Sequence, residues 1–364
     1  MPIEFAERIR RIPSYPVAAG YDLGADIAML ASNECAYRPL IEVIEAGAAV
    51  IGQSNRYPDP SYSALGNALS ERYGLSTDRI AVGNGSCDLL LAAGDALLEP
   101  GAEIVYAWPA FSVYPQLAAT SGARAIQVPL DAEGRHDLDA MLAEVTVATR
   151  LVLICNPNNP TSTSLGLEEI ERFIEQVPRN VCIVLDEAYA EFALALGDTY
   201  ASVELLQRWP NLVLLRTFSK VYGLAGLRVG YALCGSPDFR GAVNQLRQPF
   251  YLNIVAQAAA AEALKHQDVV DQRVTLTLAE RSTMVDGVRA LGLWVAESDA
   301  NFIWVKLPEA DQAAEAEAEI VKGLVQRGVL VRAGASLGEA GALRVTVGTD
   351  AENARFVAAL AELI

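Results

Sequence analysis

Short apolar runs alternate with longer amphipathic stretches through the middle of the chain. Leu151–Cys155 and Val181–Leu185 are almost wholly apolar, as expected of strands covered on both faces of a sheet. Helical patterns such as Cys87–Leu98, Asp137–Glu144 and Leu167–Gln176 lie between such runs. This alternation predicts an α/β fold built on a doubly wound, mostly parallel sheet. The predicted strands are Ile80–Val82, Glu103–Trp108, Ala125–Leu130, Leu151–Cys155, Cys182–Leu185, Leu212–Arg216 and Val229–Leu233.

The pattern changes near Asn253, where we expect one long Ala-rich helix that runs past Gln272. Short strands at Phe302–Lys306 and Leu343–Val347 indicate a smaller second α/β domain, and the Ala/Glu stretch over 311–320 reads as an exposed helix. The irregular N-terminal segment, rich in Pro and Tyr, predicts an arm that packs on the second domain or on a neighbouring chain. The expected limits are 1–38 for the arm, which joins the small domain, 39–250 for the large domain and 251–364 for the small domain.

Charge and composition narrow the class of protein. The 364 residues are 52% hydrophobic and 20% charged, which excludes a disordered chain. Lys and Arg number 28 against 45 Asp and Glu, so the net charge is −17, which argues against a nucleic-acid or anionic-membrane surface. No apolar run approaches the roughly 20 residues that a membrane span needs. A small basic pocket remains open.

Cysteine and histidine usage limits the chemistry further. The five cysteines form no C-x-x-C pair, and an odd count at wide spacing does not suggest a disulfide framework. A reducing, cytoplasmic setting is therefore expected, and the charged start of the chain does not resemble a signal peptide. With only two histidines, His136 and His266, no multi-histidine metal site can be built, and no metal is expected.

Candidate chemistry concentrates just after the predicted strands, because ligands of open α/β sheets sit beyond the carboxyl ends of the strands. The first strand is followed by Gly83-Asn84-Gly85-Ser86 and then a helix, which could cradle a phosphate or form an ordinary turn. Another strand is followed by Asn156-Pro157-Asn158-Asn159-Pro160-Thr161, a stiff polar loop that could equally be only a turn.

Two further strand ends carry charge. Asp186 ends a buried strand, where a carboxylate would need a cationic partner unless it merely caps the next helix. Lys220 follows another strand in an apolar, Gly-rich stretch, and Arg228 comes eight residues later. Convergence of these four strand ends would join an amine, a carboxylate, hydrogen-bonding groups and an anion cradle. That set suits pyridoxal 5'-phosphate.

Several strings support a family resemblance that covers nearly the whole chain. In chain order, these strings are Ser32-Asn33-Glu34, Arg56-Tyr57-Pro58-Asp59, Asn156–Thr161, Asp186–Tyr189, Arg216-Thr217-Phe218-Ser219-Lys220-Val221-Tyr222-Gly223-Leu224-Ala225-Gly226-Leu227-Arg228 and Arg344-Val345-Thr346-Val347-Gly348. They resemble the fold-type I aminotransferases of the histidinol-phosphate and aromatic (phenylalanine-type) branch. The resemblance implies a large domain on a mostly parallel sheet, a smaller α/β domain and a pyridoxal-phosphate enzyme.

The resemblance also implies roles for individual residues. Lys220 would hold the cofactor as a Schiff base and shuttle a proton, Asp186 would pair with the pyridinium nitrogen, and Tyr189 with Asn159 would hydrogen-bond the phenolic oxygen. Phe111 would stack on the ring, or else pack only in the core. The implied phosphate group is Gly85, Ser86, Ser219 and Arg228, with Ala188 on the other ring face and Tyr57 reaching the phosphate of the partner subunit in a homodimer with shared active sites.

On the substrate side, Arg344 would clamp the α-carboxylate, unless it makes only a surface ion pair, and Arg332, Tyr15 and Asn33 would also bind substrate. The histidinol-phosphate branch often has Asn and Tyr at the positions of Cys87 and Phe250, and neither residue here supplies the same polar contacts. We therefore expect transfer between an aromatic L-amino acid and a 2-oxo acid, with histidinol phosphate as the alternative substrate. A decarboxylase of the same fold and a non-catalytic regulator are weaker alternatives. The sequence leaves the natural acceptor, the pathway and any assembly beyond a dimer undetermined.

Overall fold

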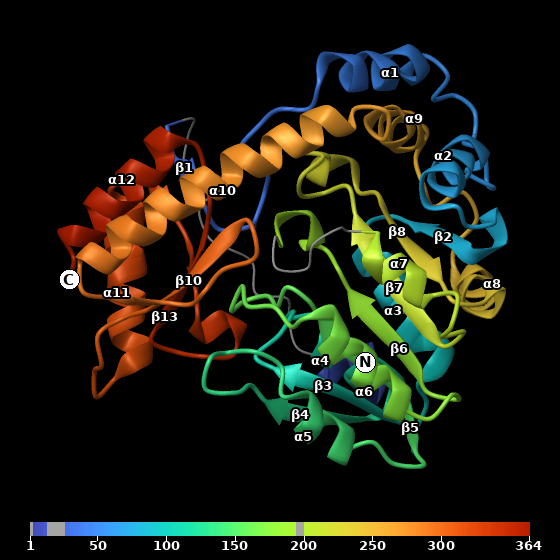
Figure 1. The fold of residues 1–364 in the computed structure, drawn as a ribbon, viewed down its shortest axis with the longest axis horizontal. Helices are drawn as coiled ribbons and strands as arrows, with labels where there is room; N and C mark the ends of the chain where they lie inside the picture. Colours follow the sequence, from blue (N-terminus) through green and yellow to red (C-terminus); the bar gives the residue numbers. More distant parts are fainter. Residues whose placement is uncertain (1–2, 13–25, 194–199) are drawn as a thin grey trace.

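A seven-stranded sheet organises the larger part of the computed structural model, which describes residues 3–12, 26–193 and 200–364 (Figure 1). Its strand order is β2-β8-β7-β6-β5-β3-β4. β8 runs antiparallel to both of its neighbours, and all other neighbouring pairs are parallel. The strands are β2 (Ile80–Gly83), β3 (Glu103–Trp108), β4 (Arg124–Pro129), β5 (Thr149–Cys155), β6 (Cys182–Asp186), β7 (Leu212–Thr217) and β8 (Gly230–Cys234).

Side chains of the central strands alternate between two buried layers, which is why these strands read as continuous apolar runs. In β5, Val152 and Ile154 belong to one layer, whereas Leu151 and Leu153 belong to the other. All seven predicted strands are confirmed to within two residues at each end. One layer is covered by α2 (Ser63–Tyr73), α5 (Leu138–Ala143), α6 (Leu167–Gln176), α7 (Ala201–Leu205) and α9 (Ile254–Ala263), and the other by α3 (Ser86–Leu97), α4 (Tyr114–Ser121) and α8 (Pro237–Leu246).

A second, smaller sheet lies beside the large one (Figure 1). Among the described residues it has four antiparallel strands in the order β12-β13-β10-β9, and a two-stranded parallel pair, β1-β11, accompanies it. Its core joins Ile303 and Leu343 to Val288 and Phe356 of the covering helices. The elements are β1 (Ala28–Met29), β9 (Trp294–Val295), β10 (Phe302–Lys306), β11 (Val329–Leu330), β12 (Arg332–Ala333), β13 (Ala342–Thr346), α10 (Gln267–Ala290), α11 (Ala313–Gln326) and α12 (Asp350–Ala361).

The described end of the N-terminal arm joins the small sheet, because Ala28 and Met29 pair with Val329 and Leu330. The division at 38/39 and 250/251 stays a prediction. α9 packs with the large sheet. It lies against α1 (Ile41–Ile51), and its Ala256 and Ala260 belong to the core of that sheet.

The prediction of one unbroken helix from Asn253 past Gln272 is wrong. The chain forms α9 and α10, and it turns at residues 264–266 between them. No Gly or Pro marks the break; it follows from packing, because α9 lies on α1 whereas α10 crosses to the small sheet (Figure 1). At the turn, His266 Nε2 and Glu262 Oε1 lie 3.2 Å apart, and Gln267 donates a hydrogen bond to the carbonyl of Leu264.

The Ala/Glu helix, expected to be exposed, has one buried carboxylate. Glu317 of α11 is 1% exposed, and its carboxylate accepts hydrogen bonds from the backbone N–H groups of Ala335, Gly341 and Ala342. A buried carboxylate needs such donors, and here they fix the segment that connects β12 to β13. Every helix within the described ranges is too short or too polar to cross a membrane.

Candidate active site

A cavity of about 340 Å³ lies between the two sheets, at the carboxyl end of the large one. Residues from both sheets and from the arm line it. Twelve of the predicted site residues are among its lining: Asn33, Ser86, Phe111, Asn159, Asp186, Ala188, Tyr189, Ser219, Lys220, Arg228, Arg332 and Arg344.

The topology of the large sheet explains this convergence. Asp186 is the last residue of β6, and Lys220 follows the end of β7 by three residues. Asn159 lies four residues beyond β5, and Ser86 opens α3 after β2. Since β2 points the same way as β5, β6 and β7, all four strands end at one edge. The sheet therefore delivers an amine, a carboxylate, an amide and a helix N-terminus to one cavity.

Lys220 presents its amine inside this cavity. Its Nζ donates a hydrogen bond to the carbonyl of Ser32 at 3.2 Å and lies 5.4 Å from the centre of the Tyr189 ring. Burial, reinforced by the positive charge of Arg344, lowers the pKa of Lys220 from 10.5 to about 7. Near neutral pH a large share of the amine is thus unprotonated, as a nucleophile or a base must be.

Asp186 is a buried carboxylate held by two donors. Its Oδ2 accepts a hydrogen bond from the Tyr114 hydroxyl at 3.1 Å, and its Oδ1 accepts one from the N–H of Ala188 at 3.3 Å. Burial raises the pKa of Asp186 to about 6, against the opposing effect of these two bonds. A cationic partner would offset the remaining cost of burial.

A chain of side chains links the large sheet to the small one across the cavity. The Tyr189 hydroxyl accepts hydrogen bonds from Asn33 Nδ2 at 3.0 Å and from Asn159 Nδ2 at 3.4 Å. Arg344, on β13, donates to Asn159 Oδ1 and to the carbonyl of Ala31, each at 2.6 Å. Arg332 is the register partner of Arg344 across the β12–β13 pair, so both arginines reach the cavity from one face.

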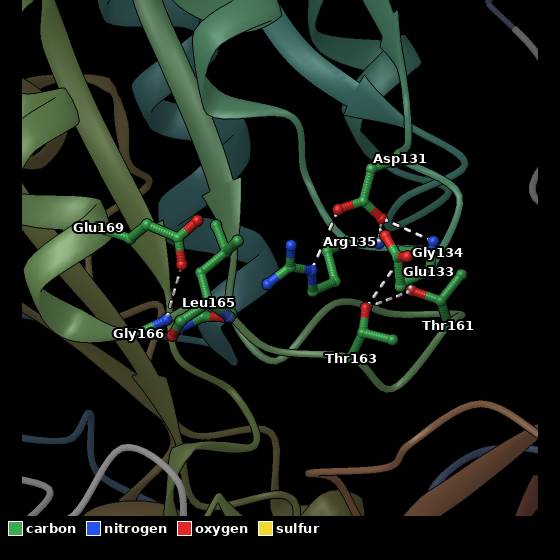
Figure 2. A network of polar contacts seen from close by, with 10 residues as sticks. Asp131, Glu133, Gly134, Arg135, Thr161, Thr163, Leu165, Gly166 and Glu169 are labelled. Atoms are coloured by element: carbon green, nitrogen blue, oxygen red, sulfur yellow. Dashed lines mark hydrogen bonds and ion pairs between the residues drawn. The ribbon is translucent and has the colours of Figure 1, made fainter.

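The loop that carries Asn159 is clamped by a neighbouring turn (Figure 2). The hydroxyls of Thr161 and Thr163 both donate to the carbonyl of Gly134 at 2.7 Å. Asp131 holds that turn by accepting hydrogen bonds from the N–H and Nε of Arg135. The clamp fixes the backbone on the C-terminal side of Asn159.

One end of the cavity has the features of a phosphate site. A Cβ at position 85 would lie 2.5 Å from a guanidinium nitrogen of Arg228, so a side chain here would push this cation away from the start of α3. Gly85 also has a φ of +83°, which glycine adopts readily. Ser86 and Ser219 add hydroxyl and backbone donors to the lining. This donor set suits a phosphate group.

Among the described residues, Tyr57 is a predicted site residue that does not line this cavity. Tyr57 is 80% exposed, and its ring stacks on that of Phe250 with 4.4 Å between the ring centres. Its predicted contact belongs to a partner subunit and stays a prediction. Tyr15 lies outside the described residues.

Sequence reasoning missed Tyr114, the hydroxyl donor to Asp186. It stands three residues after Phe111 at the start of α4, in a stretch that reads as core packing. It also missed the backbone carbonyls of Ala31 and Ser32, which accept hydrogen bonds from Arg344 and Lys220. A carbonyl has no sequence signature, so only the Ser-Asn-Glu string hinted at this contact.

The charge of the cavity is opposite to that of the whole chain. Of the described residues that line it, four are basic (Lys220, Arg228, Arg332 and Arg344) and two are acidic (Glu34 and Asp186). Although the whole chain has a net charge of −17, it thus contains a local site for anions. Such a site fits an anionic cofactor and a substrate carboxylate.

Comparison with known proteins points the same way as the geometry. A family model for aminotransferase class I and II matches residues 25–360. An aromatic amino acid aminotransferase of Streptomyces coelicolor is 41% identical over 95% of this chain and 92% of its own, and a histidinol-phosphate aminotransferase of Cupriavidus pinatubonensis is 44% identical over 92% and 88%. A crystal structure of histidinol-phosphate aminotransferase from Sinorhizobium meliloti in complex with pyridoxal-5'-phosphate superposes with a TM-score of 0.89, at 30% identity, over 99% of this chain and 97% of that one.

Proposed function

This chain belongs to the class I and II aminotransferase family and is a pyridoxal-phosphate-dependent transaminase, and from that premise we propose that its amino donor is an aromatic L-amino acid. The acceptor is a 2-oxo acid. The donor and the acceptor would bind one after the other in this one cavity.

The cavity residues would contact different parts of the cofactor. When bound, the cofactor supplies an aldehyde that exchanges amino groups and a ring that takes up electrons. Lys220 would hold the aldehyde carbon and, once released, would move a proton at the substrate Cα, since a large share of its amine is unprotonated near pH 7. Asp186 holds a proton on the pyridine nitrogen. Tyr189 and Asn159 hydrogen-bond the phenolic oxygen.

The remaining cofactor contacts orient the ring. Phe111 and Ala188 line the cavity, and we assign them to the two faces of the ring. We assign phosphate binding to Gly85, Ser86, Ser219 and Arg228. The close approach of Arg228 to Gly85 supports this assignment.

The substrate carboxylate goes to Arg344, whose planar guanidinium matches a carboxylate with two parallel hydrogen bonds. Arg332 lies beside it on β12, and Asn33 borders the same side of the cavity. Keeping the carboxylate anchored favours transamination over decarboxylation.

Cys87 is the observation that carries the choice of an aromatic donor. It lines the cavity directly after Ser86, where the histidinol-phosphate branch often has an Asn. Burial raises the pKa of the Cys87 thiol to about 11, so it stays neutral and offers at most one weak donor. A second phosphate would find poor partners there, whereas an aromatic ring packs well against sulfur.

Histidinol phosphate stays the second candidate, because a relative of that name is 44% identical. A panel of single half-reactions separates the two. Phenylalanine, tyrosine, histidinol phosphate and glutamate are mixed in turn with the holoenzyme, and the decay of the visible absorbance band is timed. We expect phenylalanine or tyrosine to react fastest. A tenfold or greater preference for histidinol phosphate, about 1.4 kcal/mol, would reject the aromatic assignment.

We further infer that the enzyme is a homodimer with shared active sites. Ile41, Ile44 and Ile51 expose much of their surface on α1, beside an apolar groove of about 410 Å³. Exposed aromatic and aliphatic side chains of this kind favour burial against a second copy. Tyr57 would then reach the phosphate in the partner's cavity.

Complementation between an inactive variant and a weakened one tests this arrangement. Lys220→Ala disables the cavity of its own subunit, and Tyr57→Ala weakens the cavity of the partner. If sites are shared, a mixed dimer contains one cavity with both residues intact, and mixing restores activity. A monomer by light scattering, or no recovery on mixing, contradicts the proposal. A reducing, cytoplasmic setting is part of the same proposal and suits the five free thiols.

A further inference from the structure

Tyr114 donates the one side-chain hydrogen bond that the described residues give to Asp186. Its hydroxyl lies 3.1 Å from Asp186 Oδ2, and the residue is 0% exposed. The ring is fixed at the start of α4 by edge-on contacts with Tyr106 and Phe111, whose centres lie 5.8 and 5.9 Å away. Water therefore cannot replace this donor without displacing core side chains.

The surroundings of Asp186 act against its negative charge. Burial has the largest effect, and Glu187 adds repulsion, whereas Lys220 and the two hydrogen bonds favour the charged form. The thiols of Cys87 and Cys155 also lie near the carboxylate, with pKa values raised by burial, so they remain neutral. The pKa of Tyr114 is itself raised well above 10 by burial, and its proton therefore stays available for donation.

We propose that Tyr114 is a positioning residue that keeps Asp186 ionised and aimed at the pyridine nitrogen of the cofactor. The inference rests on the proposed role of Asp186. Without the hydroxyl, Oδ1 would retain the Ala188 N–H and Oδ2 would lose its donor. The carboxyl would then accept a proton at higher pH, and it would hold the pyridinium less tightly.

Tyr114→Phe tests the inference, and Tyr106→Phe is its matched control. Both changes remove one hydroxyl and keep a buried ring, but the Tyr106 hydroxyl has its one hydrogen bond within the described residues with Gln127, at 3.0 Å, on the neighbouring strand. The affinity of each apoenzyme for pyridoxal phosphate is measured by absorbance from pH 5 to 9. We expect Tyr114→Phe to weaken binding about tenfold near pH 7, and to shift the acid limb of the profile upward by about one pH unit. Tyr106→Phe should match the wild type.

Repeating Tyr114→Phe in an Asp186→Asn background tells positioning from simple damage to the core. If Tyr114 acts through Asp186, the second substitution adds no further loss of affinity. An equal additional loss in that background, or identical profiles for Tyr114→Phe and Tyr106→Phe, overturns the inference. Unchanged cofactor affinity in Asp186→Asn alone would instead remove the proposed role of Asp186, so the two failures are distinguishable.

Discussion

Arg344 makes the most decisive prediction, because one side chain is asked to recognise one functional group. It is 7% exposed, and its guanidinium donates to Asn159 Oδ1 and to the carbonyl of Ala31. Arg344→Ala removes the proposed carboxylate partner and leaves every proposed cofactor-binding side chain in the sequence unchanged. The natural comparison is between phenylalanine and 2-phenylethylamine, which differ only in the carboxylate.

The size of the effect follows from two charge-assisted hydrogen bonds. Each contributes about 1.5–3 kcal/mol when buried, so about 3–6 kcal/mol is at stake. Since the guanidinium already has partners in this structure, binding the carboxylate exchanges some bonds rather than adding them all. We therefore use the lower end, about 3 kcal/mol, which corresponds to about a hundredfold change in kcat/KM.

The assay measures kcat/KM for both amines with the wild type, Arg344→Ala and Arg344→Lys. The wild type should prefer phenylalanine strongly, the Ala variant should lose about a hundredfold of that preference, and Lys should lie between because it keeps the charge without the fork. Arg289→Ala is the control, since Arg289 pairs with Glu297 at the surface.

A preference that survives in Arg344→Ala would refute the assigned role. So would an equal fall for both amines, because that pattern reports general damage to the cavity rather than loss of carboxylate recognition.

Three further predictions concern stability without cofactor. The pKa of Lys220 in the folded chain, about 7, lies below its ordinary value of 10.5. Between these two pH values the unfolded chain binds more protons than the folded one, so the stability of the wild type rises with pH. Near pH 7, Lys220→Met should therefore unfold at a higher urea concentration than the wild type, and this difference should shrink toward pH 10. Ser162 has a φ of +63°, so Ser162→Gly should be neutral or stabilising by about 1 kcal/mol, whereas Ser162→Val should destabilise. Glu317→Ala leaves three backbone N–H groups without their buried acceptor and should cost about 3 kcal/mol, against no change for the exposed Glu319→Ala.

Each of these predictions has a contrary result. A constant difference for Lys220→Met from pH 7 to 10 would show that the amine is not deprotonated on folding. A clear loss of stability in Ser162→Gly would show that its hydroxyl, which donates to the carbonyl of Thr161, outweighs the backbone strain. Equal stabilities of the two glutamate variants would show that water replaces the carboxylate of Glu317.

The strands of the large sheet, and through them Asp186 and Lys220, could be predicted from sequence. Strands covered on both faces are apolar throughout, so their ends are sharp and the polar residues beyond them stand out. The same logic located Asn159 and the start of α3. This prediction needed no individual side-chain contact, because parallel strands that lie next to each other end at the same edge of the sheet and so bring these positions together.

Other features depend on contacts that no local pattern encodes. The sequence from α9 to α10 favours a helix throughout. The helix breaks because α9 packs against α1 whereas α10 packs against the small sheet. Tyr114 reads as one more core aromatic until its hydroxyl is found 3.1 Å from Asp186. The exposure of Tyr57 likewise depends on how the chain folds and, in the proposed homodimer, on a second copy.

The short arm strand β1 has a consequence for how the enzyme is made. Residues 28–34 leave the ribosome early, yet β1 pairs with β11, and Ala31 meets Arg344 across a separation of 313 positions. Contacts this distant can form only after the chain has been synthesised through Arg344. The large sheet can therefore assemble during translation, whereas closure of the catalytic chamber must wait until β11 and β13 have left the ribosome.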